Sequence, residues 1–196
     1  MKTKILAFAG SLRRDSWNKK IVRVAAQGAT NAGAEVTLLD LRDLPMPIYD
    51  EDIERADGLP AHAKQLKQLM KEHQGFLIAS PEYNSSISAA LKNAIDWASR
   101  AEPGEPALAC YQGKVAGLVA ASPGALGGLR GLVTARSILG NLGVIVVPEQ
   151  VAVSKVGEAF GEDGKMKDAR QIAALERVGA RVANVAAALA AYTPRA

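Results

Sequence analysis

Short runs of apolar residues alternate along the chain with longer stretches in which apolar residues recur every three or four positions. The short runs predict β-strands, at residues 4–9, 35–39, 75–80, 114–121 and 143–147. The longer stretches predict helices, at residues 16–28, 60–73, 87–98, 126–142 and 167–191. Residues 42–58 and 102–112 contain proline and follow neither period, so they are predicted loops, and Pro148 is expected to end the fifth strand.

This alternation predicts an α/β protein. The continuous apolar run 76–79 is typical of a strand covered on both faces. Five strands alternating with five helices favour a five-stranded parallel sheet between two helical layers, a three-layer sandwich. Right-handed crossovers leave few topologies, and the strand order 2-1-3-4-5 is the leading choice. The length of 196 residues fits a single domain over residues 1–196.

Composition narrows the class of protein further. The hydrophobic fraction of 48% and the charged fraction of 22% are those of an ordinary globular protein. No apolar run approaches the roughly 18 residues of a membrane span. The net charge is +4, and aromatic residues make up 5%, with no basic-aromatic pattern to favour nucleic acid. The single cysteine, Cys110, excludes an intrachain disulfide and favours a reducing, cytoplasmic location.

The strand order also predicts where a ligand binds. In such sheets ligands lie beyond the carboxyl ends of the strands, near the switch point between strands 1 and 3. The loops that follow the first, third and fourth strands are therefore the candidate site.

The first loop, residues 10–18, leads into a helix. A helix N-terminus offers unpaired N–H groups and a positive dipole end, which suit a phosphate. Short polar side chains and one cation add donors, and the candidate phosphate-binding residues are Ser11, Arg13, Ser16, Trp17 and Asn18. The alternative is that Asp15 or Ser16 only caps the helix while the arginines are solvated.

Two phosphate-binding motifs are missing from this loop. It lacks Gly-x-Gly-x-x-Gly, so a dinucleotide pyrophosphate has no close backbone seat, and it lacks the P-loop pattern of nucleotide hydrolases. Asp40 is accordingly expected to end strand 2 rather than bind a ribose. A loop of hydroxyls, amide and arginine suits a monophosphate.

The loop after strand 3 carries groups that could face a planar heterocycle. Pro81 stiffens it, the backbone of Glu82, Tyr83 and Asn84 is free to contact a ring system, and Tyr83 could pack near the rings. The alternative is a turn in which Asn84, Ser85 or Ser86 caps the next helix. These two roles can coexist.

The loop after strand 4 is rich in glycine. Ser122, Gly124, Gly127 and Gly128 allow close approach of backbone to a ligand. A tight turn without a ligand explains the same residues equally well.

Taken together, these segments resemble the NADPH-dependent FMN reductase family, in particular its bacterial quinone, azo-dye and chromate reductases. The resemblance runs from about residue 4 to about 150. It is carried by residues 10–13 with Ser16 and Asn18, by 44–50, by 81–84 followed by 91–97, and by 122–124 with 127–128. One departure is Ser88, at the start of the third predicted helix, where the family often has proline. The absence of proline is expected to loosen the turn before this helix without removing a ligand.

The resemblance implies a flavodoxin-like fold and a non-covalent FMN. The phosphate would lie at Ser11, Arg13, Ser16 and Asn18, and the ring against residues 81–84 with Ser122 nearby. NADPH or NADH would be the co-substrate, and a quinone, free flavin, azo compound or metal oxyanion such as chromate the acceptor. A homodimer or homotetramer is implied, and residues 91–97 are assigned to core and interface. FMN carries the chemistry, so no catalytic side chain and no metal ligand are named.

Three other functions compete with this interpretation. A flavodoxin-type electron carrier is usually acidic, whereas this chain has a pI of about 9.2. A response-regulator domain needs acidic residues after strand 1, and a Rossmann domain needs the glycine fingerprint. His62 and His73 are expected at the surface, Cys110 has no assigned role, and Arg130 is expected either in a surface salt bridge or at a partner or nicotinamide phosphate.

Overall fold

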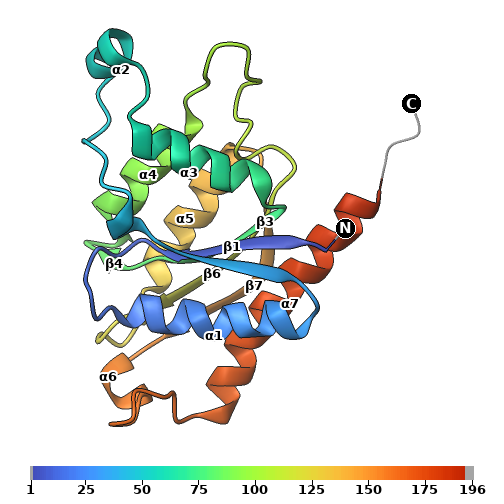
Figure 1. Cartoon of the computed structure of the whole chain (residues 1–196). Coiled ribbons are helices and arrows are strands. Elements are labelled where there is room, and N and C mark those ends of the chain that lie inside the picture. The colour runs from blue at the N-terminus through green and yellow to red at the C-terminus, as the bar shows by residue number, and fades with distance from the viewer. Residues whose placement is uncertain (1, 193–196) are drawn as a thin grey trace.

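The computed structural model describes residues 2–192. A five-stranded parallel sheet runs through the molecule, with helices on both of its faces (Figure 1). Its strands, in the spatial order β2-β1-β3-β6-β7, are β2 Glu35–Asp40, β1 Lys4–Ala9, β3 Gly75–Ala79, β6 Val115–Ala121 and β7 Ile145–Val153. Because β6 and β7 are the fourth and fifth strands of this sheet, the predicted order 2-1-3-4-5 is confirmed. The expected single domain extends to Met1 and residues 193–196, which lie outside the described residues.

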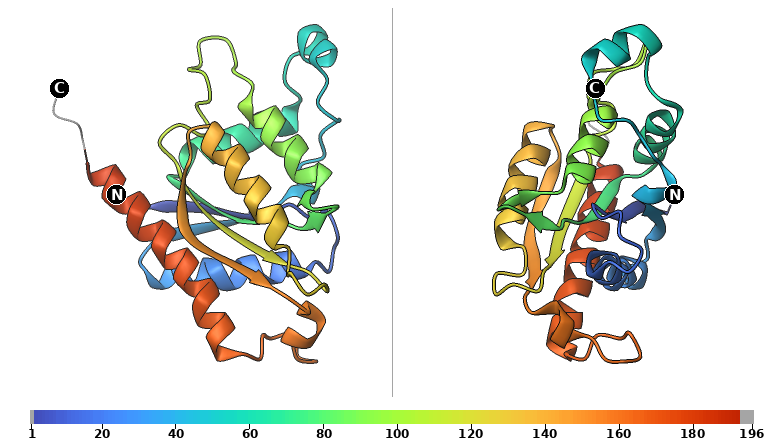
Figure 2. Two further views of the ribbon diagram at one scale, coloured as in Figure 1. Left: turned by 180° about the vertical axis from the view of Figure 1, so that it is seen from behind. Right: turned by 90° about the vertical axis from the view of Figure 1, so that its left-hand side faces the viewer.

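The helices form two layers. One face of the sheet is covered by α1 Trp17–Asn31 and α7 Ala169–Ala191, and the other by α3 Ala61–Glu72, α4 Ala89–Ser99 and α5 Leu129–Asn141 (Figure 2). The connections contain short elements: the 3-10 turn η1 Leu41–Asp43, α2 Glu51–Asp57, α6 Val156–Ala159 and a hairpin of β4 Glu82–Tyr83 with β5 Ser86–Ile87.

The central strand β1 shows why both faces are covered. Side chains alternate across a strand, and Ile5 and Ala7 pack with α1 and α7, while Leu6 and Phe8 pack with α3, α4 and α5. All four are at most 4% exposed. A strand with apolar residues on both sides is stable only between two apolar layers.

Two glycines set the separation of α1 and α7. A Cβ at Gly28 would lie 1.9 Å from the carbonyl oxygen of Glu176, and one at Gly179 would lie 1.8 Å from that of Ala25. These backbones are therefore in direct contact, and any side chain at either position would force the helices apart.

The fifth strand is longer than the sequence predicts. Pro148 does not end β7, because the strand bulges there: Ala116 pairs with Val146, whereas Leu118 pairs with Gln150. The Arg136 guanidinium of α5 donates to the carbonyl of Val146 at 3.2 Å and to that of Val147 at 2.9 Å. The carbonyls that the bulge frees thus keep a partner, and the strand resumes.

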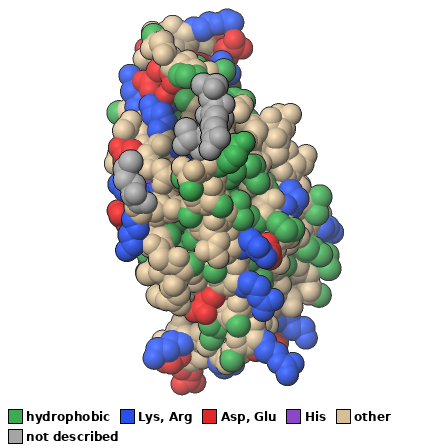
Figure 3. Space-filling view, turned by 90° about the vertical axis from the view of Figure 1, so that its right-hand side faces the viewer, with side chains coloured by type: hydrophobic (Ala, Val, Ile, Leu, Met, Phe, Trp, Pro, Cys, Tyr) green, Lys and Arg blue, Asp and Glu red, His purple; other side chains and the backbone are tan. Residues whose placement is uncertain are grey.

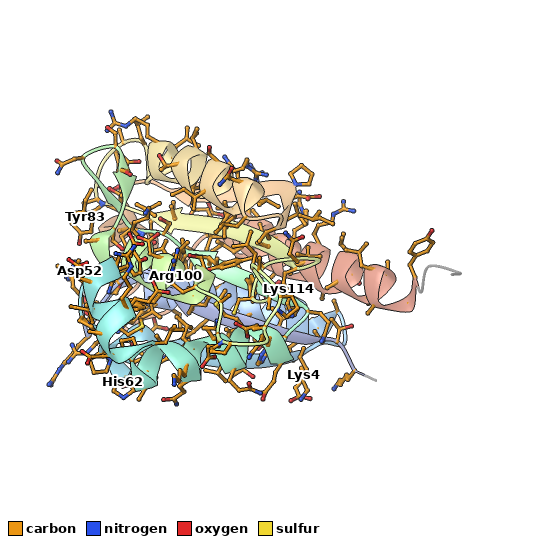
Figure 4. The ribbon with its side chains drawn as sticks, turned by 90° about the horizontal axis from the view of Figure 1, so that it is seen from above. Lys4, Asp52, His62, Tyr83, Arg100 and Lys114 are labelled. Carbon is orange, nitrogen blue, oxygen red and sulfur yellow. The ribbon has the colours of Figure 1, made fainter. Side chains whose placement is uncertain are left out.

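The predicted loop 42–58 contains a helix. The Asp50 carboxylate caps α2 by accepting from the Asp52 N–H at 2.8 Å. Behind it, Arg100 of the α4 end pairs with Glu54 at 2.9 Å. Figure 4 shows Arg100 and Asp52 toward the end of the molecule that also holds Tyr83, with Lys4 and Lys114 toward the opposite end.

The segment before α2 is fastened to α4. The Trp97 indole N–H donates to the Pro47 carbonyl at 2.8 Å, and the Asn93 amide donates to the same oxygen at 2.9 Å. The expected core role of residues 91–97 therefore includes holding this segment.

His73 is buried, so its expected surface position is wrong. It is 4% exposed, with Nδ1 2.6 Å from the Leu69 carbonyl and Nε2 2.8 Å from the Thr37 hydroxyl. His62 lies nearer the surface, 2.8 Å from the Pro45 carbonyl. Cys110 is buried at 1% exposure, and burial raises the pKa of its thiol, so it is not a reactive surface group.

None of the helices within residues 2–192 is both long and apolar enough to span a bilayer. In the same range, no three His, Cys, Asp or Glu side chains gather as metal ligands. On the face at the amino ends of the strands, hydrophobic side chains are spread over the middle and right of the view, with Lys and Arg among them (Figure 3).

Candidate functional site

The three predicted loops lie at one edge of the sheet, beyond the carboxyl ends of β1, β3 and β6 (Figure 2, right). Backbone hydrogen bonds bind each loop to a neighbouring strand. The Gly10 N–H donates to Ala79 O at 2.9 Å, the Ser80 N–H to Val119 O at 2.9 Å, and the Ser122 N–H to Val153 O at 3.1 Å. The loops therefore start from fixed points on the sheet.

The start of α1 has no acidic residue or side-chain cap of its own. Its first turn contains no acidic residue, and the N-cap residue Ser16 makes no side-chain capping hydrogen bond. The first N–H groups of a helix have no partner within the helix, and its dipole is positive at that end. The alternative in which the Ser16 side chain caps α1 is thus not what the structure shows.

Arg13 stands free at the rim of this helix end. It is exposed, and its guanidinium has no hydrogen bond or ion pair to any residue within 2–192. Its N–H donates to the Ser11 hydroxyl at 3.4 Å, which shapes the loop locally. Asp15, the acid in the loop, pairs with Lys20 at 2.8 Å, so its charge is compensated.

Asn18 is buried and is hydrogen-bonded to the backbone at the end of β6. Its Nδ2 donates to the carbonyl of Ala121 at 3.0 Å, and its Oδ1 accepts from the N–H of Ala121 at 3.0 Å. It is 5% exposed. Asn18 therefore ties the start of α1 to the end of β6, through one hydrogen bond from Nδ2 and one to Oδ1.

The Trp17 ring contacts the segment after α6. Its centroid lies 4.9 Å from that of Phe160, and the Lys20 ammonium lies 4.2 Å from the Trp17 centroid. This packing sets the position of the Trp17 indole. The backbone N–H of Trp17 is one of the first N–H groups of α1, which have no partner within the helix.

The loop after β3 is a tight hairpin. Asn84 and Ser85 form its turn with φ of 50° and 65°, as a two-residue turn between antiparallel strands requires. The residue that caps α4 is Ser88, which accepts from the Leu91 N–H at 3.1 Å. The alternative in which residue 84, 85 or 86 caps this helix is therefore wrong. Tyr83 is 56% exposed at the same edge.

Glu82 fastens the hairpin to α5. Its carboxylate accepts from the Gly131 N–H at 2.9 Å and from Arg130 at 3.1 Å. The hydrogen bond from Gly131 and the Arg130 charge hold the pKa of Glu82 below its ordinary value, although burial opposes them. Arg130 thus forms the salt bridge that was one of its two expected roles.

The glycines of the third loop have two different uses. A Cβ at Gly127 would lie 2.7 Å from the Ser154 backbone nitrogen, and one at Gly128, whose φ is 95°, would lie 2.8 Å from the Ala120 Cβ. Both are thus required by packing and backbone conformation. Gly124 is exposed, and its N–H donates to the Ser122 hydroxyl at 3.1 Å.

Two contacts to the first loop were not anticipated. Arg42 donates to the Leu12 carbonyl at 3.1 Å, and the Ser88 hydroxyl donates to the Gly10 carbonyl. Ser88, which stands where the family often has proline, caps α4 and contacts the loop, so its hydroxyl holds this turn at two points. A serine before a helix is a recognisable cap, but its second partner lies 78 positions away.

Comparison with known proteins shows the family of the chain. The model of the NADPH-dependent FMN reductase family matches residues 3–158. An NAD(P)H-dependent FMN reductase of Pseudomonas aeruginosa is 34% identical over 166 residues, which are 84% of this chain and 85% of that protein. A quinone reductase of Escherichia coli is 35% identical over 167 residues, covering 82% and 85%.

A solved structure shows the same architecture. FerB, a flavoenzyme NAD(P)H:(acceptor) oxidoreductase from Paracoccus denitrificans, matches with a TM-score of 0.76 at 25% identity, over 95% of this chain and 98% of that one. By sequence and by structure, the chain belongs to the NADPH-dependent FMN reductase family.

Proposed function

We propose that the protein is an FMN-dependent NAD(P)H oxidoreductase that binds its cofactor across the three loops. The observation that carries the proposal is the start of α1, where free N–H groups, an uncapped Ser16 and an unpaired Arg13 meet without a neighbouring acid in the first turn. Such a set of donors fits a phosphate monoester. When bound, FMN would supply the redox chemistry, taking two electrons from NAD(P)H and passing them to an acceptor.

The chain's residues then divide between direct binding and positioning. Ser11, Arg13, Ser16 and the N–H of Trp17 would bind the phosphate. Asn18 would hold the helix start in place, since its amide groups are used by Ala121.

The ring system would lie against the hairpin. Pro81 is buried and fixes the start of this loop, and the backbone of Glu82, Tyr83 and Asn84 would contact the edge of the ring. Tyr83 is exposed and free to cover an aromatic ligand. On the opposite side, Ser122 and the exposed Gly124 would approach the ring, because Gly124 has no side chain to exclude it.

The acceptor would be a small molecule. Quinones and free flavin are supported by the names of the two relatives. We include azo compounds and chromate among the proposed electron acceptors. A planar acceptor could replace the nicotinamide over the same ring face, which gives a ping-pong scheme with one shared site.

The oligomeric state and location follow as parts of the proposal. We propose a homodimer or homotetramer, supported by three apolar side chains in and just before the start of α5, Leu126, Leu129 and Val133, which are 49%, 42% and 63% exposed. Light scattering of the 20.6 kDa chain tests this, and a monomer contradicts it. The cytoplasm is proposed as the location, with support from the single, buried Cys110.

Cofactor identity and the phosphate site are tested together. The purified protein should release FMN on heating, and release of FAD, or of no flavin after reconstitution with FMN, contradicts the proposal. Arg13→Ala should weaken FMN about tenfold or more, and riboflavin little, because a charge-assisted hydrogen bond is worth roughly 1.5–3 kcal/mol. Arg14→Ala is the matched control, since it removes an equal exposed charge from the next position. Equal losses in both variants would indicate a general charge effect.

A further inference from the structure

Ser88 makes two hydrogen bonds that join different parts of the site. Its hydroxyl accepts from the Leu91 N–H at 3.1 Å, which caps α4. It also donates to the carbonyl of Gly10, the first residue of the loop 10–18. The side chain is buried, with the residue 6% exposed. One hydroxyl therefore uses both its donor and an acceptor position inside the protein.

Gly10 is fixed on every side. Its N–H donates to Ala79 of β3 at 2.9 Å. A Cβ at this position would lie 2.7 Å from the Leu91 Cβ, so α4 approaches the loop backbone directly. The Ser88 bond to the carbonyl completes this set and determines how the peptide plane after Gly10 is turned.

The other end of the loop is fixed by Asn18 through Ala121. Between these two points, Leu12, Arg13, Arg14 and Asp15 are exposed. A short exposed span between two fixed ends loses less freedom when it closes on a ligand than a free loop does.

We propose that Ser88 is a positioning residue that sets the Gly10 carbonyl and so preorganises residues 11–16 for the cofactor phosphate. This inference rests on the proposed function. It assigns to Ser88 a role in affinity for the phosphate, in addition to its capping of α4.

Proline offers a way to separate the effect on FMN affinity from the effect on stability. Ser88 has φ of −70°, close to the value that proline imposes, and the preceding residue Ile87 is in an extended strand. Ser88→Pro therefore fits the backbone at the start of α4 and lowers the freedom of the unfolded chain, but it removes the hydroxyl. Ser88→Thr keeps the hydroxyl and serves as the conservative variant.

The experiment measures the Kd of FMN and of riboflavin for the apoprotein by quenching of flavin fluorescence, and the urea midpoint of each variant. The matched control is Ser99→Ala, which removes a serine hydroxyl bonded to Asp96 O at 2.7 Å at the far end of the same helix. Ser88→Ala and Ser88→Pro should each raise the FMN Kd roughly fivefold and change the riboflavin Kd less than about twofold. Ser88→Thr and Ser99→Ala should bind both ligands as the wild type does.

The outcomes are separable. Ser88→Ala should lower the urea midpoint more than Ser88→Pro does, because both lose the two hydrogen bonds but proline also lowers the freedom of the unfolded chain. If Ser88→Pro binds FMN as tightly as wild type, or if both variants weaken FMN and riboflavin equally, the positioning role is overturned while the proposed function stands. If wild-type protein binds neither flavin, the proposed function fails and this inference fails with it.

Discussion

Replacing Asn18 with alanine should destabilise the protein even without a ligand. Asn18 lies in the first turn of α1, and its amide makes two 3.0 Å hydrogen bonds to the backbone of Ala121. Both residues are 5% exposed. The substitution therefore removes the partners of one buried N–H and one buried carbonyl at the end of β6.

The expected loss is about 2–4 kcal/mol. A buried polar group left without a partner costs about 1–3 kcal/mol, and two such groups are created. Together these costs come to about 2–6 kcal/mol, and water that enters the vacated space would recover part of them, which favours the lower half of that range. Against a typical stability of roughly 5–15 kcal/mol, such a loss is readily measured.

The assay is urea unfolding of the apoprotein followed by far-ultraviolet circular dichroism. Asn31→Ala is the matched control, because Asn31 is at the opposite end of the same helix and accepts from Gln27 at 2.8 Å in an exposed pair. Its loss should be about 0.5 kcal/mol or less. If Asn18→Ala is no more destabilising than Asn31→Ala, the amide does not tie α1 to β6, and Asn18 would return to the set of direct phosphate ligands.

Three further substitutions test other parts of the structure. Gly179→Ala should cost more than about 3 kcal/mol, since its Cβ would lie 1.8 Å from Ala25 O, and a thermal melt unchanged from wild type would contradict the close contact. Hydrogen bonds from Lys67 and Lys71 outweigh the effect of burial and lower the pKa of Glu105 from 4.5 to about 2. A carboxyl whose pKa is lower in the folded state than in the unfolded chain stabilises the fold at pH values above the unfolded-state pKa. Up to about 3 kcal/mol of the free energy of unfolding should therefore be lost as the pH falls from 4.5 toward 2. Glu105→Gln should flatten this part of the acid-unfolding curve. Ser85→Gly should raise the free energy of unfolding by about 1 kcal/mol, because φ of 65° is unfavourable for serine; a loss of stability would argue against the left-handed turn.

The sheet could be predicted from the sequence because its signal is local. The apolar run at Phe76 and the alternation of strands with helices require only neighbouring residues, and they sufficed for the strand order. The continuation of β7 through Pro148 could not be predicted in this way. It depends on Arg136, whose guanidinium reaches the freed carbonyls from another element.

The candidate site shows the same division. The sequence placed the right loops together, because parallel strands bring their carboxyl ends to one edge. It could not assign individual polar side chains to ligand or protein. Asn18 has a partner 103 positions away, and Glu82 contacts Gly131 across 49 positions. Only the fold shows that these side chains are already engaged.

Anaerobic reduction tests the central claim most directly. Protein reconstituted with FMN is mixed with NADPH or NADH under anaerobic conditions, and the visible flavin absorbance is followed before and after addition of a benzoquinone. The account predicts that a nicotinamide cofactor bleaches the flavin directly and that the quinone restores the oxidised spectrum. If neither NADPH nor NADH bleaches the flavin, while a separate reductase protein does, the protein is an electron carrier and the proposed enzyme function is contradicted.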